Sequence, residues 1–367
     1  MAIYKILVMA DGASIHTEKW IYGLSLNPEF EIYLLTMNPS GARPSIGINN
    51  KVKTVFEVHN NNTVKDANNY WYVKNVLKIR EIVKKVKPDI INTIYLTSYG
   101  LMGSLMKDNV LLSHFMIGTD IMVTPQKNFL YKLLTKFALF RGDYFVSSSK
   151  TMTKSLLRLH NIPSERLLTQ QYGVGEEVIN YPRLGKVYDF ISNRAWVPNS
   201  NIPLILEIFK CLEIPLNHAI IGQGGVQEKK IHGLLSQLPQ VKHLGTLQYM
   251  DNIHAVAQSK YYISLTSSDG ASLSLMEAMA LGVVPVVSDV APNLEWVEDG
   301  YNGFVVDIND ISKTVSKFEY IAQLPDNLRL VMAARCIDII KKRGRLVENM
   351  KKFSDNILKL LKERDER

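Results

Sequence analysis

Leu265–Asp289 reads LTSSDGASLSLMEAMALGVVPVVSD and is the most informative segment of this sequence. A strand is expected to end at Leu265, a polar loop with the turn dipeptide Asp269-Gly270 follows, a helix runs to Gly282, and Val283–Val287 forms a buried strand. This order builds an anion site in an open parallel sheet, because free N–H groups of the first helical turn point at the loop and the helix dipole favours negative charge there. Gly270, without a Cβ, allows close backbone approach.

Two acids lie in this segment, Asp269 in the loop and Glu277 in the helix. A phosphate site flanked by two carboxylates suits a ligand that carries both phosphates and hydroxyls, as sugar nucleotides do. The same residues also fit a purely structural interpretation. Ser274-Leu275-Met276-Glu277 matches a capping box, in which Glu277 caps the helix, and Asp269 alone would form an Asx-turn.

Length and composition limit the classes of protein to which this chain can belong. A chain of 367 residues is long enough for two domains, and 46% hydrophobic with 21% charged residues is typical of a globular protein. Two cysteines, Cys211 and Cys336, provide neither a disulfide framework nor metal-ligand spacing, which favours a reducing, cytoplasmic setting. The first residues read as a strand rather than a signal peptide, and no apolar run is long enough to span a membrane. A net charge of +8 favours an anionic partner.

Predicted strands alternate with predicted helices, which indicates parallel sheets with helical crossovers. In the first half the expected strands are Ile3–Ala10, Glu31–Thr36, Thr54–Val58, Ile90–Tyr95, Leu111–Met116 and Phe145–Ser147, with the rest of Asn38–Asn69 expected as loop. In the second half they are Val187–Ser192, Ala219–Ile221, Lys242–Leu244, Ile263–Leu265 and Val283–Val287, and the tail after Asp326 is expected to be helical.

Residues of about 172–186, rich in glycine without a period, are expected to form a linker. The resulting domains are 1–175 and 186–344, with a C-terminal helix at about 345–367 packing back on the first. The expected fold class is α/β, with two doubly wound Rossmann-like domains facing each other across a cleft, and ligands of such sheets bind at the carboxyl ends of the strands.

The segment Asn128–Arg141 combines apolar residues with Lys132, Lys136 and Arg141. Two interpretations fit it. A helix of this composition lies on a membrane surface, or it packs on the sheet with its lysines extending into water. The second is favoured, because most apolar stripes belong to a core.

Motifs in order along most of the chain resemble those of retaining glycosyltransferases of the family-four type, which have the GT-B fold. SDGASLSLMEAMALGVVPVVSD is similar to the family signature of an acid, seven residues and Glu, followed by Ala-Met-Ala, Gly and Pro. The other matching stretches are SIHTEKW at 14–20, GTDI at 118–121, YGVGE at 172–176, NRAWVP at 193–198, IGQGG at 221–225 and EWVEDGYNGFVV at 295–306.

The resemblance implies roles for the matching residues. Glu277 would accept hydrogen bonds from ribose hydroxyls, Asp269 would contact hydroxyls of the donor sugar, and Arg194 would bind the leaving phosphate with its planar fork. Asp120 and His16 would lie on the acceptor side, and Asp120 is counted with Arg194, Asp269 and Glu277 as a catalytic candidate. The remaining donor-binding candidates are Gly12, Asn199, Gly222, Gly224, Gly270, Ala271 and Ser272.

Three positions depart from the family pattern. Asp269 stands where the broad family has Glu, which leaves the identity of the donor sugar open. Asn199 stands where a Lys is usual, so the expected phosphate site has lost one charge. Ile117 occupies the position of a histidine, and no catalytic role for a histidine there can be carried over to this chain.

The resemblance implies an enzyme that moves a sugar from a nucleoside diphosphate to a carbohydrate hydroxyl of a polysaccharide, a lipopolysaccharide or another lipid-linked glycan, with retention of configuration. It also implies independence of metals and cofactors, and the sequence has no Asp-x-Asp motif. The expected location is cytoplasmic, peripheral on the inner face of an anionic plasma membrane. A sugar-nucleotide epimerase and a non-catalytic binding module are the alternatives. Nucleic acid is not an expected partner, because the basic residues are spread along the chain without interleaved aromatics.

Overall fold

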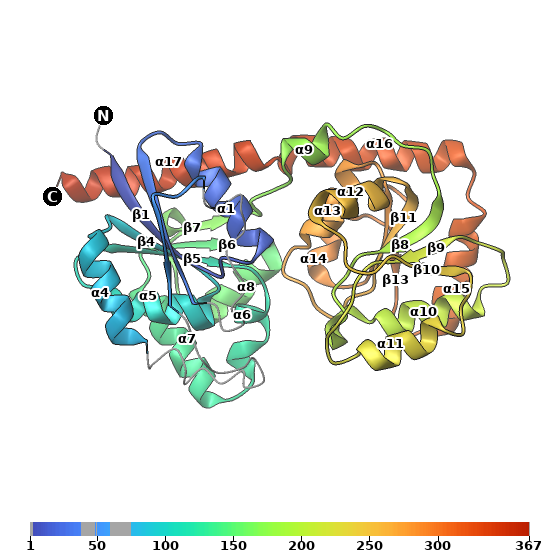
Figure 1. Cartoon of the computed structure of the whole chain (residues 1–367), viewed down its shortest axis with the longest axis horizontal. Coiled ribbons are helices and arrows are strands. Elements are labelled where there is room, and N and C mark those ends of the chain that lie inside the picture. Colours follow the sequence, from blue (N-terminus) through green and yellow to red (C-terminus); the bar gives the residue numbers. More distant parts are fainter. Residues whose placement is uncertain (1–2, 38–47, 49, 59–74, 367) are drawn as a thin grey trace. The chain divides into compact units, whose positions relative to one another are not determined.

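The computed structural model describes residues 3–37, 48, 50–58 and 75–366. The prediction for Asn38–Asn69 therefore falls largely outside the described residues. The chain forms two compact units (Figure 1): unit 1 combines Met1–Tyr172 with Leu346–Arg367, and unit 2 is Gly173–Arg345. Most of the glycine-rich segment expected as a linker belongs to unit 2, where Val174 N–H donates to Gly344 O at 2.7 Å and Arg345 forms an ion pair with Glu176 at 2.9 Å.

Unit 1 is built on a seven-stranded sheet in which every neighbouring pair is parallel, in the order β3-β2-β1-β4-β5-β6-β7. Its strands are β1 (Tyr4–Met9), β2 (Phe30–Thr36), β3 (Thr54–Glu57), β4 (Ile90–Ile94), β5 (Leu111–Met116), β6 (Tyr144–Ser147) and β7 (Leu167–Thr169). Its longer helices are α1 (Ile15–Ser25), α4 (Val76–Val86), α5 (Leu101–Met106), α7 (Phe129–Arg141), α8 (Lys150–Leu159) and α17 (Leu346–Asp365), with a short α6 (Thr119–Met122).

Unit 2 is built on a six-stranded parallel sheet in the order β10-β9-β8-β11-β12-β13. Its strands are β8 (Tyr188–Ser192), β9 (His218–Ile220), β10 (Val241–His243), β11 (Ser259–Ser264), β12 (Val284–Ser288) and β13 (Phe304–Val306). Its helices are α9 (Glu176–Ile179), α10 (Ile202–Cys211), α11 (Glu228–Leu235), α12 (Tyr249–Ala257), α13 (Leu273–Ala280), α14 (Ala291–Leu294), α15 (Ile311–Ala322) and α16 (Asp326–Arg343).

The two doubly wound α/β sheets agree with the expected fold class, because helices cover both faces of each sheet (Figure 1) and central strands such as β12 are buried along their whole length. All the strands predicted in the described residues are present, with ends shifted by a few positions. Two strands escaped prediction, β7 and β13. Each has three residues, as do β9 and β10, but Gly222 and Gly245 mark the ends of β9 and β10, whereas no glycine turn follows β7 or β13 as closely.

Trp20 joins three elements of unit 1. It lies on α1, is 1% exposed, stacks on Phe115 of β5 with ring centroids 4.2 Å apart and contacts Phe353 of α17 at 4.6 Å. Its indole N–H donates to Asn92 Oδ1 at 2.6 Å. Gly23 allows α1 and α17 to approach, because a Cβ at this position would overlap the side chain of Met350. The core of unit 1 therefore includes the last helix of the chain.

His114, in β5, is fully buried and held as a neutral ring. Its Nδ1 lies 2.7 Å from Thr93 Oγ1, and its Nε2 lies 3.1 Å from the carbonyl oxygen of Ala138. Burial lowers the pKa of His114 to about 3, and burial likewise lowers the pKa of His218 in β9 to about 4. Both imidazoles are structural groups of the two sheets.

Stability should fall as the pH is lowered from 6.5, the ordinary pKa of histidine, towards 4. In this window the unfolded chain protonates both histidines and the folded protein protonates neither, so each lowers the free energy of unfolding by up to about 1.4 kcal/mol per pH unit. Urea unfolding over this pH range measures the slope. His114→Asn should make the transition of unit 1 less pH-dependent, and an unchanged slope would contradict the assignment.

Candidate functional site

The residues of the opening segment meet those of the NRAWVP motif at the topological switch point of unit 2. β8 and β11 are neighbours in the sheet, and the chain leaves them in opposite lateral directions, to β9 and to β12. Arg194 follows β8, and Asp269 lies in the loop that follows β11. Because both loops emerge from the carboxyl ends of adjacent strands, the topology brings them together at the place where open α/β sheets bind ligands.

Arg194 forms the centre of this cluster. Its Nη2 lies 2.9 Å from Asp269 Oδ2, and its Nη1 donates to Ser272 Oγ at 2.6 Å and lies 3.3 Å from Ser274 Oγ. The side chains of Arg194 and Asp269 are 16% and 14% exposed. Ion pairs this far from bulk water are screened much less than surface pairs. The fork of Arg194 is thereby fixed over the entry to α13.

The buried Tyr262 holds the residues around Arg194 in place through hydrogen bonds. Tyr262, in β11, donates its hydroxyl to Asn193 Oδ1 at 2.9 Å and lies 3.0 Å from Ser274 Oγ. Burial raises the pKa of Tyr262. Burial by itself would lower the pKa of Arg194, but the carboxylate of Asp269 and the Tyr262 hydroxyl outweigh it and raise the pKa. Arg194 is therefore a permanent, oriented positive charge.

Ser272 caps α13, because its hydroxyl accepts from the N–H of Leu275 at 3.2 Å. The capping-box interpretation of Ser274 and Glu277 is wrong, since Ser274 lies inside the helix and Glu277 lies two residues beyond the position that a capping box requires. Gly270, Ala271 and Ser272 are buried and lead directly into the first turn of α13. The first turn of α13 and the guanidinium of Arg194 bring positive charge together at the start of this helix, which suits a negatively charged ligand group.

Glu277 lies one turn further along α13 and is 6% exposed. Its Oε1 accepts from the hydroxyl of Tyr249, the first residue of α12, at 2.6 Å. This bond fixes the position of the Glu277 carboxylate between α12 and α13. Asp269 Oδ1, for its part, accepts from the N–H of Gly270 at 2.9 Å.

Asn199 fixes the loop before Asp269. Its Nδ2 donates to the carbonyl of Ser268 at 2.8 Å, and its Oδ1 accepts from Ser268 N–H at 3.0 Å and from the Ser267 hydroxyl at 2.9 Å. Both ends of the amide are used, so Asn199 does not replace the charge of the family's lysine. It positions the loop that carries Asp269.

The turn after β9 adopts backbone conformations that favour glycine. Gly222 and Gly224 have φ values of +134° and +78°, which side chains other than glycine rarely adopt. A Cβ at Gly222 would also clash with the indole of Trp196. The Gly224 N–H donates to Glu228 Oε1 at 3.1 Å. The turn closely approaches the segment that carries Arg194.

The unit 1 candidates lie at the carboxyl end of β1 and on the following helix. The Gly12 N–H donates to Thr36 Oγ1 at 2.9 Å, which joins the first loop to β2. His16, in the first turn of α1, is half-buried, and its Nδ1 lies 2.6 Å from the hydroxyl of Tyr172. Ser14 caps the same helix by accepting from the His16 N–H at 3.3 Å.

Asp120, expected on the acceptor side, does not present its side chain to solvent. Its side chain is fully buried, and its two oxygens accept from the N–H groups of Leu96 and Gly118, each at 2.9 Å. Burial raises the pKa of this carboxyl against the opposing effect of the backbone donors. Through the Leu96 N–H, Asp120 stabilises a π-helical turn at Leu96–Gly100. The residue before that turn, Tyr95, has a strained left-handed φ of +78°.

Two residues of the unit 2 cluster could not be found from the sequence. Tyr249 and Tyr262 carry no local signal, because they act through contacts that only the folded sheet creates. Asn193 lies in the NRAWVP stretch, but that stretch did not predict its bond to Tyr262. Within the described residues, no three His, Cys, Asp or Glu side chains gather as they would around a metal ion. None of the described helices is long and apolar enough to cross a bilayer.

Two family comparisons cover most of the chain. The family described as Glycosyl transferase 4-like matches residues 5–149, and the family described as Glycosyl transferases group 1 matches residues 176–343. These regions include the Arg194 cluster in unit 2 and the first loop of unit 1.

Relatives and solved structures agree with these matches. The chain is 23% identical over 365 residues to an uncharacterized glycosyltransferase of Methanocaldococcus jannaschii, covering 96% of this chain and 94% of the relative. It is 22% identical over 319 residues to an Escherichia coli UDP-Gal:alpha-D-GlcNAc-diphosphoundecaprenol alpha-1,3-galactosyltransferase, covering 77% and 78%. The Anabaena protein HepE, solved with UDP and glucose, superposes with a TM-score of 0.74 at 13% identity, covering 97% of this chain and 100% of HepE. The chain therefore belongs to the GT-B glycosyltransferases of the family-four type.

Proposed function

We propose that this glycosyltransferase moves a hexose from a nucleoside diphosphate sugar to a carbohydrate hydroxyl, with retention of the anomeric configuration. One observation carries the proposal: Arg194, Asp269 and the capped N-terminus of α13 converge at the switch point of unit 2. A diphosphate is the ligand group that matches an oriented guanidinium and free helical N–H groups.

The proposed chemistry follows from where charge develops. As the bond between the sugar and the phosphate breaks, negative charge grows on the leaving phosphate. Arg194 and the first turn of α13 then stabilise this charge from fixed positions, so little reorganisation is required during the reaction. No metal is needed in this scheme, because the guanidinium and the helix dipole supply the positive field. Glu277 and Asp269 would bind hydroxyls of the ribose and the sugar.

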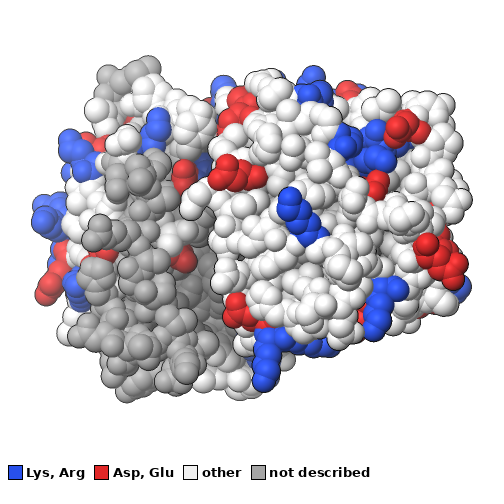
Figure 2. Space-filling model, turned by 45° about the vertical axis from the view of Figure 1, so that its right-hand side comes forward, with Lys and Arg blue, Asp and Glu red and all other residues white. Residues whose placement is uncertain are grey.

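The names of the relatives support the choice of ligands. The Escherichia coli relative uses UDP-galactose and a diphosphoundecaprenol-linked sugar, and HepE was solved with UDP and glucose. By analogy we propose a UDP-sugar or a similar donor and a lipid-linked glycan acceptor, with the protein working peripherally at the cytoplasmic face of an anionic membrane. A nucleic-acid partner is disfavoured, since Figure 2 shows basic and acidic side chains interspersed on the visible face rather than one continuous basic tract.

A thermal-shift screen of sugar nucleotides tests donor binding. A true donor at 100 times its Kd should stabilise the protein by about 2.7 kcal/mol, whereas inorganic phosphate at that concentration should not. Transfer is then followed with a synthetic lipid-linked acceptor, and NMR of the product gives the anomeric configuration. Inversion, or loss of activity in EDTA, would contradict the corresponding part of the proposal.

The same assays separate the alternatives. An epimerase releases an isomerised sugar nucleotide when no acceptor is present, and chromatography of the nucleotide pool detects it. A binding module shows donor binding without turnover on any acceptor. Failure of every sugar nucleotide to bind or react would remove the proposed function itself.

A further inference from the structure

Helix α7 presents an apolar stripe to solvent. The helix packs on the sheet as predicted, but only through Ala138 and Leu139, which join the core around β5 and β6. Most of its apolar side chains are exposed instead of buried. Its exposed apolar side chains, with their exposed fractions, are Phe129 (75%), Leu130 (62%), Leu133 (47%), Phe137 (38%) and Phe140 (75%). At about 100° per residue these five positions fall within one arc of roughly 100°, so they form a single stripe along the helix.

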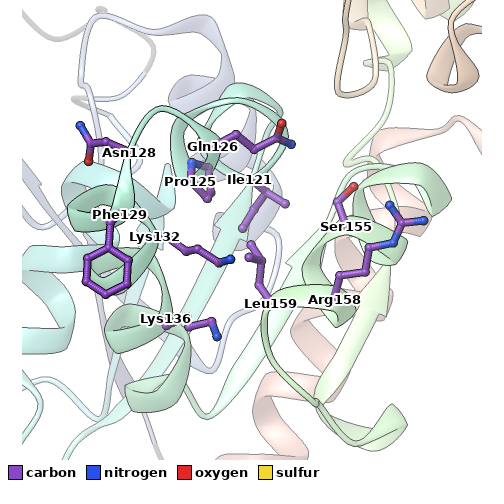
Figure 3. Close-up of a pocket in the computed structure, with 10 residues that line it drawn as sticks. All are labelled: Ile121, Pro125, Gln126, Asn128, Phe129, Lys132, Lys136, Ser155, Arg158 and Leu159. Atoms are coloured by element: carbon purple, nitrogen blue, oxygen red, sulfur yellow. The ribbon is translucent and has the colours of Figure 1, made fainter.

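A basic cavity adjoins this stripe. Its volume is about 510 Å³, and its walls come from α7, α8, α6 and the turn at Thr124–Gln126. In Figure 3, Lys132 and Lys136 extend from α7 towards α8, which carries Ser155 and Arg158 on the opposite wall. Lys132 and Lys136 also flank the apolar stripe, because they occupy the neighbouring arc of the same helix. Apolar and cationic groups therefore share one surface.

Basic residues far outnumber acidic residues in the segment that forms the cavity. Residues 121–163 contain seven Lys or Arg and one acid, Asp143, although the whole chain has a net charge of only +8. Asp143 is already engaged by Lys107 at 2.6 Å and Arg166 at 3.8 Å. Among the residues that the structure describes, the cavity cations Lys132, Lys136 and Arg158 have no acidic partner. Their charge remains available to an anion.

We propose that this stripe and cavity form a docking surface for an anionic membrane. The apolar side chains of α7 enter the boundary between headgroups and acyl chains, and the cavity receives the phosphate of a lipid headgroup, with Lys132, Lys136 and Arg158 as its counter-charges. A helix with an exposed apolar stripe bordered by lysines is the form that lies in such an interface. An apolar stripe next to lysines favours a membrane over a protein as the partner, because protein–protein interfaces are depleted in lysine.

This inference rests on the proposed function in one respect, the membrane-embedded acceptor. Binding to vesicles requires neither donor nor transfer, so the two can fail separately. Flotation of the full-length protein with vesicles of phosphatidylcholine alone, or mixed with phosphatidylglycerol, measures binding at low and high salt. The protein should float with the mixed vesicles at low salt, float less at high salt and stay free with neutral vesicles.

Two variants with matched controls test the two parts of the surface. The triple change Lys132→Gln, Lys136→Gln and Arg158→Gln should weaken binding to mixed vesicles by about 100-fold. The triple change Lys229→Gln, Lys230→Gln and Lys341→Gln removes equal charge from exposed positions of unit 2 and should have a much smaller effect. Phe129→Ser with Phe140→Ser should also weaken binding, whereas Leu330→Ser with Val331→Ser on α16 should not.

Several outcomes would overturn the proposal. The first is absence of wild-type binding to mixed vesicles at low salt. The second is an equal loss of binding in the charge variant and in its control. The third is that pyrophosphate displaces the wild type and the charge variant from vesicles equally well. A dimer that Phe129→Ser with Phe140→Ser dissociates, combined with no vesicle binding, would assign the stripe to a second copy of the chain. Melting temperatures close to that of the wild type show that the variants are folded.

Discussion

Arg194→Ala is expected to lower kcat for sugar transfer by about 10²–10³-fold, which corresponds to about 3–4 kcal/mol of transition-state stabilisation. The reason is the position of the guanidinium, which is fixed by Asp269 and Ser272 at the entry to α13. Without the guanidinium, the carboxylate of Asp269 repels the negative charge that grows on the leaving phosphate. The phosphate also loses its strongest hydrogen-bond donor. Steady-state kinetics with the donor found by the thermal-shift screen measures the loss.

A second substitution separates a phosphate role from a structural one. If Arg194 only neutralises the partly buried Asp269, then Arg194→Ala combined with Asp269→Asn should transfer sugar as fast as Asp269→Asn alone, because no unpaired charge is left. If Arg194 binds phosphate, the double variant should be slower than Asp269→Asn alone by about the factor that Arg194→Ala costs the wild type. Arg194→Lys retains the charge without the planar fork and should recover only part of the rate. Arg335→Ala, on α16 where the guanidinium stacks on Tyr301 at 4.2 Å, is the matched control and should retain full activity.

Trp20→Ala is expected to destabilise unit 1 by about 3–5 kcal/mol. The indole is 1% exposed and contacts both Phe115 and Phe353, so its removal leaves a cavity between α1, β5 and α17. It also leaves Asn92, a buried polar side chain, without its indole donor. Few single changes in this unit remove as much buried contact.

Hydrogen exchange measures this effect unit by unit, which matters because a two-domain chain does not unfold in one transition. Protection should fall for the amides of β1, β5 and α17 and remain unchanged for those of β8 and β11. Tyr22→Ala is a control on the same helix, since its side chain is 39% exposed, and it should cost less than about 1 kcal/mol. Equal loss of protection in both units would contradict the assignment of Trp20 to one core.

The sequence predicts the fold well because parallel strands are buried on both faces. Continuous apolar runs such as Val283–Val287 predict such strands. The loops that follow the strands place Arg194 and Asp269 at the carboxyl ends of the sheet. The short strands β7 and β13 were missed because, unlike the equally short β9 and β10, they are not followed closely by a glycine turn. Residue type and order were therefore sufficient to predict the sheet and to bring Arg194 and Asp269 to the same edge of it.

Side-chain orientation was beyond the sequence in two places. Asp120 follows a strand in a Gly-Thr-Asp loop, as a ligand-binding acid would, but the turn at Leu96–Gly100 supplies it with a backbone donor from a distant segment. Helix α7 has apolar residues around most of its circumference, so its pattern does not say which side meets the sheet. Only the packing of Ala138 and Leu139 selects the buried side.

The placement of α17 has a consequence for how the protein is made. Unit 1 starts near the N-terminus but includes Leu346–Arg367, whereas unit 2 is a single continuous segment between its two parts. On the ribosome, unit 2 emerges completely while the surface around Trp20 still lacks Phe353 and Met350. At about 5–20 residues per second this delay lasts on the order of ten seconds or more. Throughout it the nascent chain displays an uncovered apolar face, so unit 1 is the part that a chaperone would have to protect during synthesis.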